Sequence, residues 1–202
     1  MSLSESTLCD ILHNSMTHKK MIAGLSVDGE QTGSGILSVG EFGQVFCWTL
    51  PQNIEPAKLK KGYDTPQVLT TKGEFDATVL SVNKRPPREA ALLYVHCKPG
   101  TFTKPRLRYF HGRLKKGQVI QVYKFEDGKV LFEETRVRLD QRGFRLHFEN
   151  APAHVGSPVL YKSRSITCLF GLVGTVGNAG ATSVPSLYVA RNNIISDVLP
   201  RR

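Results

Sequence analysis

The sequence has little of what disulfide-stapled, metal-binding or membrane-spanning proteins need. Its four cysteines are scattered, with no CxxC pair and no histidine cluster at zinc spacing. We therefore expect neither a disulfide framework nor a metal site, and no cofactor. The scattered cysteines favour a reduced, cytosolic setting, and the amino terminus lacks the basic-then-apolar pattern expected of a signal peptide. The longest uncharged stretch, 165–190, contains several glycines and a proline, so two buried strands and a turn are expected there rather than a membrane helix.

Acidic residues are also scarce relative to basic ones. The chain has 17 Asp and Glu against 27 Lys and Arg, a formal net charge of +10. An excess of this size indicates an acidic partner, of which nucleic acid is the commonest, ahead of anionic membranes and acidic proteins. The hydrophobic content of 40% is that of an ordinary globular protein, so 202 residues suit one compact unit or two closely packed halves.

Short runs rich in Val, Ile, Leu, Thr and Tyr recur along most of the chain. Turn signals such as Asp28-Gly29 and Asp127-Gly128 separate them, which is typical of an all-β protein. The predicted strands are Ile22–Val27, Gly35–Val39, Gln44–Leu50, Gln67–Thr71, Ala77–Asn83, Ala91–Cys97, Gln118–Lys124, Val130–Arg138, Phe144–Phe148, Pro158–Tyr161, Ile166–Val176 and Val184–Ala190.

Two segments without strand character frame these runs, and a third divides them. Apolar residues at three- and four-residue spacing predict an amphipathic amino-terminal helix, and Pro200 ends a short carboxy-terminal one. Two prolines and a glycine between Lys98 and Pro105 indicate a linker. The predicted organisation is a helix over 1–20, a first β-barrel over 21–97, a linker over 98–105, a second β-barrel over 106–190, and a helix and tail over 191–202.

The segment Asn150–Leu160 contains His-Val-Gly-Ser-Pro and resembles the nucleophile loop of a chymotrypsin-like protease. In such loops the residue before Gly-Ser-Pro carries the attacking hydroxyl or thiol, because the glycine lets backbone amides turn toward the developing oxyanion. Here that residue is Val155, with Gly156 at the former oxyanion position. An isopropyl group cannot be deprotonated and cannot attack a carbonyl, so the frame of the site is predicted to remain without its chemistry.

Together with the strand layout, four segments make the chain resemble the picornaviral 3C-type main cysteine protease. They are Thr49–Ile54, Glu89–Leu93, Leu107–Gly117 and Gly171–Val176. The resemblance implies an all-β, chymotrypsin-like double β-barrel with short helices at both ends. It spans most of the chain, and it depends on the order and spacing of the segments, since each match alone is unspecific.

The resemblance also assigns degenerate roles to three further residues. It puts Asn53 at the general-base position, Glu89 at the acidic position of the triad, and Val176 where the family has the histidine that lines its glutamine-selective pocket. The Asn53 amide does not take up a proton near neutral pH, so it cannot act as a base. Nucleophile, base and pocket histidine are then all missing, and we expect negligible peptide hydrolysis.

A basic segment follows Glu89, with eight Lys or Arg and no Asp or Glu before Glu126. Lys104, Arg106 and Arg108 alternate, so an extended chain places them on one side, where they can follow a phosphate backbone. Tyr109, with Phe110 and His111, offers a stacking face for an unpaired base. The resemblance points the same way, since family members bind RNA at the interdomain connection. The predicted RNA-binding residues are Lys104, Arg106, Arg108, Tyr109, Arg113, Lys115 and Lys116.

The leading interpretation is therefore a catalytically inactive viral 3C-like pseudoprotease of the host cytoplasm, which binds RNA and has viral or host proteins as further partners. Three alternatives stay open. The first is an active viral peptidase that uses Cys97, Cys168 or Ser157 with His96, His111 or His154. The second is a peptide-binding scaffold without an RNA role, with its cleft near Val155 and Val176. In the third, the alignment is shifted and these positions are ordinary core residues.

Overall fold

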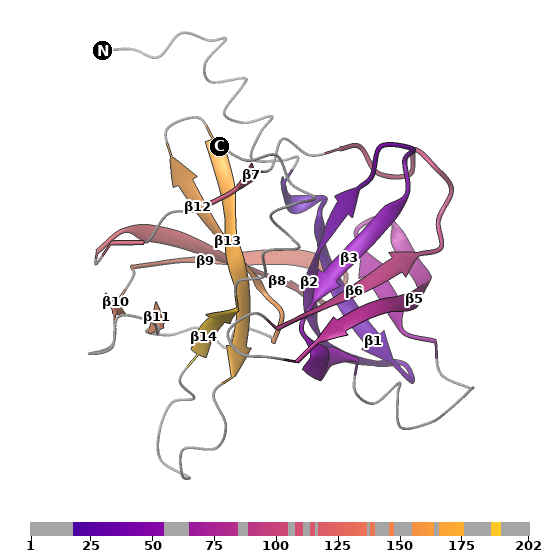
Figure 1. Ribbon diagram of the computed structural model, residues 1–202, viewed down its shortest axis with the longest axis horizontal. Helices are drawn as coiled ribbons and strands as arrows, with labels where there is room; N and C mark the ends of the chain where they lie inside the picture. Colours follow the sequence, from indigo (N-terminus) through magenta and orange to yellow (C-terminus); the bar gives the residue numbers. More distant parts are fainter. Residues whose placement is uncertain are drawn as a thin grey trace, which may run out of the picture.

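The computed structural model groups the strands into two halves, one between Ile22 and Val95 and the other between Arg108 and Ala190 (Figure 1). The structure describes residues 18–54, 65–84, 89–104, 108–110, 114–115, 117–136, 138–139, 146–147, 155–163, 166–175 and 187–190. The predicted terminal helices lie outside these residues, except that His18 and Lys19 are helical. No helix among the described residues is long and apolar enough to cross a membrane.

The first half is a closed antiparallel barrel with the strand order β1-β2-β3-β6-β5-β4. Alternation of inward and outward side chains builds it. On β6, for example, Leu93 and Val95 are buried in the barrel, whereas Leu92 and Tyr94 are only half-buried. The strands are β1 (Ile22–Val27), β2 (Glu30–Val39), β3 (Val45–Thr49), β4 (Gln67–Thr70), β5 (Gly73–Asn83) and β6 (Ala90–Val95).

The second half contains a six-stranded sheet and a separate two-stranded ribbon. The sheet has the order β14-β13-β12-β8-β9, and β7 joins it by pairing in parallel with β13. These strands are β7 (Arg108–Tyr109), β8 (Val119–Glu126), β9 (Lys129–Arg136), β12 (Pro158–Ser163), β13 (Ile166–Thr175) and β14 (Leu187–Ala190); the ribbon is β10 (Arg138–Leu139) with β11 (Leu146–His147). The prediction of an all-β protein is confirmed.

Two tight hairpins confirm the Asp-Gly turn signals. At the β1–β2 turn, Asp28 and Gly29 have φ of 56° and 79°, and at the β8–β9 turn Asp127 and Gly128 have φ of 49° and 73°. Two successive positive φ values are characteristic of type I′ turns, whose twist matches that of the flanking strands, and Asp-Gly tolerates them well. In each hairpin the two-residue turn sets the register of the strands that follow.

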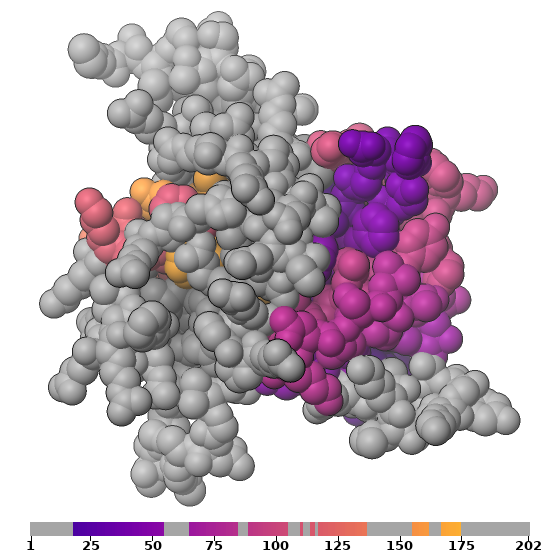
Figure 2. Space-filling model, viewed as in Figure 1, coloured from indigo at the N-terminus to yellow at the C-terminus, as the bar shows by residue number. Residues whose placement is uncertain are grey.

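One hydrophobic core joins the two halves. Tyr123 and Phe125 of β8 belong to the same buried cluster as the barrel residues, and so does Leu169 of β13. The contact between β1 and β8 is close, because a Cβ placed on Gly24 would lie 2.8 Å from the Phe125 ring. Figure 2 shows the barrel strands as one continuous coloured surface on one side of the molecule.

Candidate functional site at the junction of the two halves

A single 3-10 turn, η1 (Pro51–Asn53), follows β3 and faces the second half of the chain. Proline suits the first position of the turn because it lacks the N–H that would go unpaired there. Leu50 and Ile54, on either side, are fully buried and hold the turn in place. Gln52 is exposed, whereas Asn53 is only 1% exposed.

The Asn53 side chain is surrounded by hydrogen-bond acceptors. Its Nδ2 lies 2.7 Å from Thr49 Oγ1, 2.8 Å from the Val155 carbonyl oxygen and 3.2 Å from the Ser34 carbonyl oxygen. Three acceptors around one atom identify it as the NH₂ end of the amide. Gly33 makes room for the group, since a Cβ there would lie 2.4 Å from it. The amide therefore fastens β2, η1 and the segment at residue 155 together.

The Val155–Gly156 segment is bound on both of its sides. The Val155 carbonyl accepts hydrogen bonds from the Ser34 N–H at 2.9 Å and from Asn53, while the Gly156 N–H donates to the Val173 carbonyl at 2.7 Å. The Gly156 amide, predicted at the former oxyanion position, is thus engaged within the fold. These three hydrogen bonds join backbone groups and the Asn53 amide.

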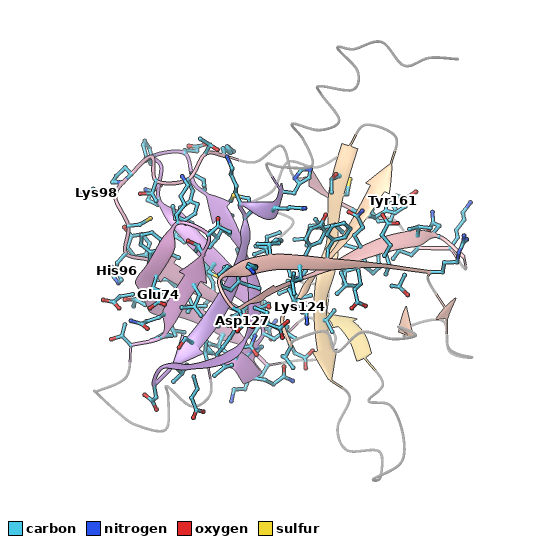
Figure 3. All side chains as sticks on the ribbon, turned by 180° about the vertical axis from the view of Figure 1, so that it is seen from behind. Glu74, His96, Lys98, Lys124, Asp127 and Tyr161 are labelled. Carbon is cyan, nitrogen blue, oxygen red and sulfur yellow. The ribbon has the colours of Figure 1, made fainter. Side chains whose placement is uncertain are left out.

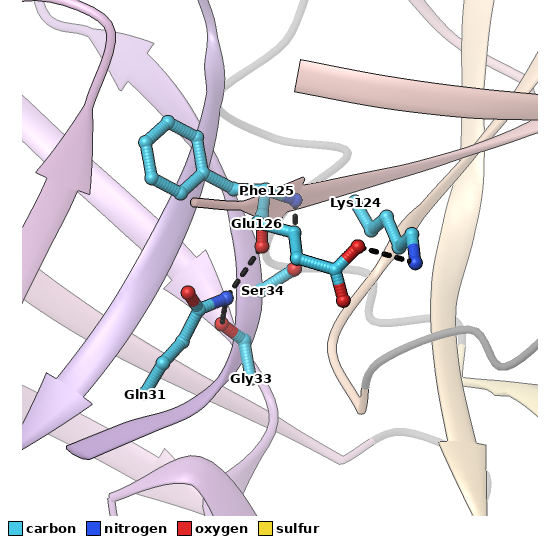
Figure 4. Close-up of polar contacts among 6 residues, drawn as sticks. All are labelled: Gln31, Gly33, Ser34, Lys124, Phe125 and Glu126. Atoms are coloured by element: carbon cyan, nitrogen blue, oxygen red, sulfur yellow. Dashed lines mark hydrogen bonds and ion pairs between the residues drawn. The ribbon is translucent and has the colours of Figure 1, made fainter. Parts of the chain in front are cut away.

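A second set of hydrogen bonds joins the same part of β2 to β8 (Figure 4). Gln31 Nε2 donates to the Phe125 carbonyl, and the Phe125 N–H donates to Ser34 Oγ at 3.2 Å. Ser34 therefore contacts the second half through both its backbone and its side chain.

Glu89 lies at the same end of the barrel as η1. It directly precedes β6, whose Ala91 pairs with Thr49 at the end of β3. The start of β6, which Glu89 precedes, therefore lies beside the end of β3, which η1 follows. Of the degenerate triad positions, Asn53 and Val155 are in direct contact, and Glu89 lies at the same end of the barrel. Val176 lies outside the described residues.

Gln52 is the side chain that sequence reasoning missed. A proteolytic base must reach the substrate, and in this turn only Gln52 is exposed, while Asn53 points inward. The sequence offers only a weak indication of this. The apolar residues Leu50 and Ile54 flank the three-residue turn, so only one side of the turn can face solvent. An amide stands at both positions, so neither supplies a general base.

The three alternative nucleophiles are poorly placed for catalysis. Ser157 and Cys168 are enclosed, and the Cys97 thiol has a raised pKa. Ser157 and Cys168 are fully buried, and Ser157 Oγ has no partner among the described residues. Burial raises the pKa of the half-buried Cys97 thiol, against a smaller lowering by the Thr101 hydrogen bond.

His96 lies on the outer wall of the barrel (Figure 3), with its ring 2.8 Å from Thr78 Oγ1. His111 and His154 lie outside the described residues.

The predicted RNA-binding residues are only partly described. Lys104 and Lys115 are exposed. Arg108 and Tyr109 form β7, in register with Cys168 and Leu169 of β13. Arg106, Arg113 and Lys116 lie outside the described residues. The described part of the chain contains no group of three or more His, Cys, Asp or Glu suited to a metal ion.

Phe110, which was expected to offer a stacking face with Tyr109 and His111, is half-buried. Its ring centroid lies 4.9 Å from that of Tyr161 and 6.2 Å from that of Phe170. The side chain therefore packs on the core of the second half.

Comparison with known proteins gives matches in structure alone. No family model and no curated protein matches the sequence. Deg5 matches with a TM-score of 0.62 at 16% identity, over 96% of this chain and 94% of that one. The apo MamO protease domain from Magnetospirillum magneticum matches with a TM-score of 0.56 at 17% identity, over 92% of this chain and 99% of that one. The inactive form of the Rv3671c protease of M. tuberculosis matches with a TM-score of 0.54 at 16% identity, over 94% of this chain and 92% of that one.

The fold is that of the chymotrypsin-like proteases. This confirms the fold class predicted from the sequence. At these identities the likeness concerns the chymotrypsin-like fold and not the activity. None of the three structures is a picornaviral 3C-type enzyme, so they add nothing to that part of the resemblance.

Proposed function

We propose that this chain is a protease-fold module that does not hydrolyse peptides and that binds RNA. The observation that carries the first part is the hydrogen bond from Asn53 Nδ2 to the Val155 carbonyl. At the junction where a chymotrypsin-like protease performs its chemistry, this chain has an amide used as a structural link. The side chain at the nucleophile position is apolar, and the next hydroxyl, that of Ser157, is buried.

Restoring the nucleophile alone is expected to leave the chain inactive. A Val155→Cys variant gains a thiol, but the general-base position beside it holds the Asn53 amide, which cannot accept the thiol proton. Members of a triad act as a unit, so one of them contributes little without the others. Neither the natural chain nor this variant should cleave a peptide library followed by mass spectrometry. Cleavage by the natural chain that disappears in Ser157→Ala, Cys97→Ala or His96→Ala would establish the active-peptidase alternative instead.

The RNA-binding part is supported by charge. The chain carries a formal net charge of +10, and its basic segment is free of acidic residues over its whole length. Lys104 and Lys115 of that segment are exposed. The resemblance to picornaviral 3C-type proteases adds a binding region at the interdomain connection. On that basis we propose a viral non-structural protein of the host cytoplasm, with viral or host proteins as additional partners.

RNA affinity is expected to fall steeply with salt, because each phosphate contact releases counterions. If Lys104, Arg106 and Arg108 contact phosphates, replacing all three with alanine should flatten the slope of log K against log salt by about two to three units. Fluorescence anisotropy with a single-stranded RNA measures this slope. As a matched control, we choose three exposed lysines outside the segment, Lys20, Lys84 and Lys129, whose replacement should change the slope less. Salt-independent binding, or none at low salt, would contradict the proposal.

A further inference from the structure

Segments from three parts of the chain meet at the end of the second sheet that lies away from the Asp127–Gly128 turn. Strand β9 ends there at Arg136, which is paired with Val119 at the start of β8. Strand β12 runs antiparallel to β8, so it ends where β8 begins. Figure 3 shows Tyr161 of β12 away from Asp127, on the side toward this end of the sheet. The start of β8, the end of β9 and the end of β12 are therefore neighbours.

Each of these segments is basic in sequence. The stretches 104–124, 135–139 and 156–176 contain Lys and Arg but no Asp or Glu, in a chain that has 17 acidic residues. Glu134 is the acid before Arg136 on β9, and its carboxylate accepts a hydrogen bond from Gln121 Nε2 at 2.7 Å. Lys115 and Arg136 are exposed. We call Lys115, Gly117 and Arg136 the basic end, and its charge favours a polyanionic partner.

Hydrogen bonds connect the two exposed cations of the basic end through the backbone. Arg136 Nη1 donates to the Gly117 carbonyl oxygen at 3.4 Å. The Lys115 N–H donates to Gln118 Oε1, and the Gln118 N–H donates to the Lys115 carbonyl oxygen at 3.1 Å. Gln118 Nε2 in turn donates to the Tyr161 hydroxyl at 3.2 Å. Both cations therefore project from an ordered turn, and a preorganised site loses less entropy on binding.

We propose, resting on the RNA-binding function above, that the basic end holds RNA phosphates and that Arg136, outside the basic segment predicted from the sequence, is an RNA-binding residue. A guanidinium has five N–H donors, and the bond to Gly117 uses one of them. The others suit a phosphate, which arginine commonly binds with two parallel hydrogen bonds. Lys115 supplies a second charge from the adjoining turn. Phosphate contacts carry no base information, so the basic end accepts RNA of any sequence.

Neutral substitutions count the phosphate contacts. With the full chain and a fluorescently labelled single-stranded RNA, Arg136→Gln and Lys115→Gln should each flatten the slope of log K against log salt by about 0.7, and the double variant by about 1.4. Arg136→Lys keeps the charge and should keep the slope. Lys129→Gln, at the exposed opposite end of β9, is the matched control and should leave the slope unchanged. Circular dichroism and thermal melts verify that each variant is folded.

The outcomes separate the basic end from RNA binding as such. A natural chain that binds RNA with a steep salt slope, which neither Arg136→Gln nor the double variant changes, would overturn the basic end and leave RNA binding in place. A natural chain that binds no RNA at low salt would overturn both. A purely structural role for Arg136 would lower the affinity equally at every salt concentration. A strong base preference that Arg136→Gln abolishes would show a base contact and overturn the assignment to phosphate.

Discussion

Replacing Gly156 with alanine is expected to lower the free energy of unfolding by about 3 kcal/mol or more. A Cβ at this position would lie 2.1 Å from the Ser34 carbonyl oxygen, 2.6 Å from Asn53 Nδ2 and 2.7 Å from Thr49 Oγ1. The first of these is a backbone atom in a barrel strand, so it can move only if the strand moves. The φ of +84° adds strain for any L side chain.

Gly100→Ala separates the two contributions. Gly100 has a φ of +83°, but a Cβ there would meet nothing within 4 Å. Its replacement should cost only the left-handed strain, about 1–2 kcal/mol. Urea denaturation of both variants gives the difference, which measures the steric cost at the junction. Equal losses in the two variants would mean that the junction can open to accept a methyl group.

Asn53→Asp is expected to lose about 3 kcal/mol or more at pH 7, although the two side chains have the same shape. The change replaces the NH₂ group with an oxygen that faces the acceptors of Ser34, Thr49 and Val155. A buried carboxylate surrounded by oxygens is unpaired, and both burial and repulsion favour its neutral form. The introduced carboxyl group should therefore have a higher pKa in the folded chain than in the unfolded one.

The sign of the pH dependence follows from that shift. A group with a raised folded-state pKa binds its proton more tightly in the folded chain. The variant is therefore least destabilised below the unfolded-state pKa of about 3.9, and loses stability as pH rises through the folded-state value. Gln52→Glu makes the same chemical change at the exposed neighbour and should stay within about 0.5 kcal/mol of the natural chain. Urea denaturation between pH 4 and 7 measures both. A loss in Asn53→Asp that does not vary with pH would contradict the account.

The strands were largely predictable because apolar residues along them either alternate with polar ones or form continuous runs. Ile22–Val27 has the predicted bounds, since a mostly apolar run that ends at Asp-Gly leaves little choice. Strand β2 begins at Glu30, five residues before the predicted start, because its polar first residues pair with β1 without being buried. Strand β7 could not be predicted: two residues carry no period, and only tertiary pairing with β13 defines them.

The site was predictable in its chemistry and not in its geometry. The missing hydroxyl at Val155 could be recognised from the sequence, because Gly-Ser-Pro marks the loop. The direction of Asn53 could not, since a three-residue turn presents one amide outward and the next inward, and sequence alone does not distinguish Gln52 from Asn53. Two of the three acceptors that decide it, the carbonyl oxygens of Ser34 and Val155, are distant from Asn53 in the chain.

The bond between Asn53 and Val155 joins residues 102 positions apart. Contacts of such long range are slow to form, because the entropy of closing the intervening chain is lost before the contact contributes. During synthesis, the strands of the barrel are complete once Val95 has emerged. The Asn53 amide and the Ser34 N–H still lack the Val155 carbonyl, and Ser34 Oγ still lacks the Phe125 N–H. The barrel thus completes its polar contacts only when residue 155 arrives, and the two halves mature as one cooperative unit.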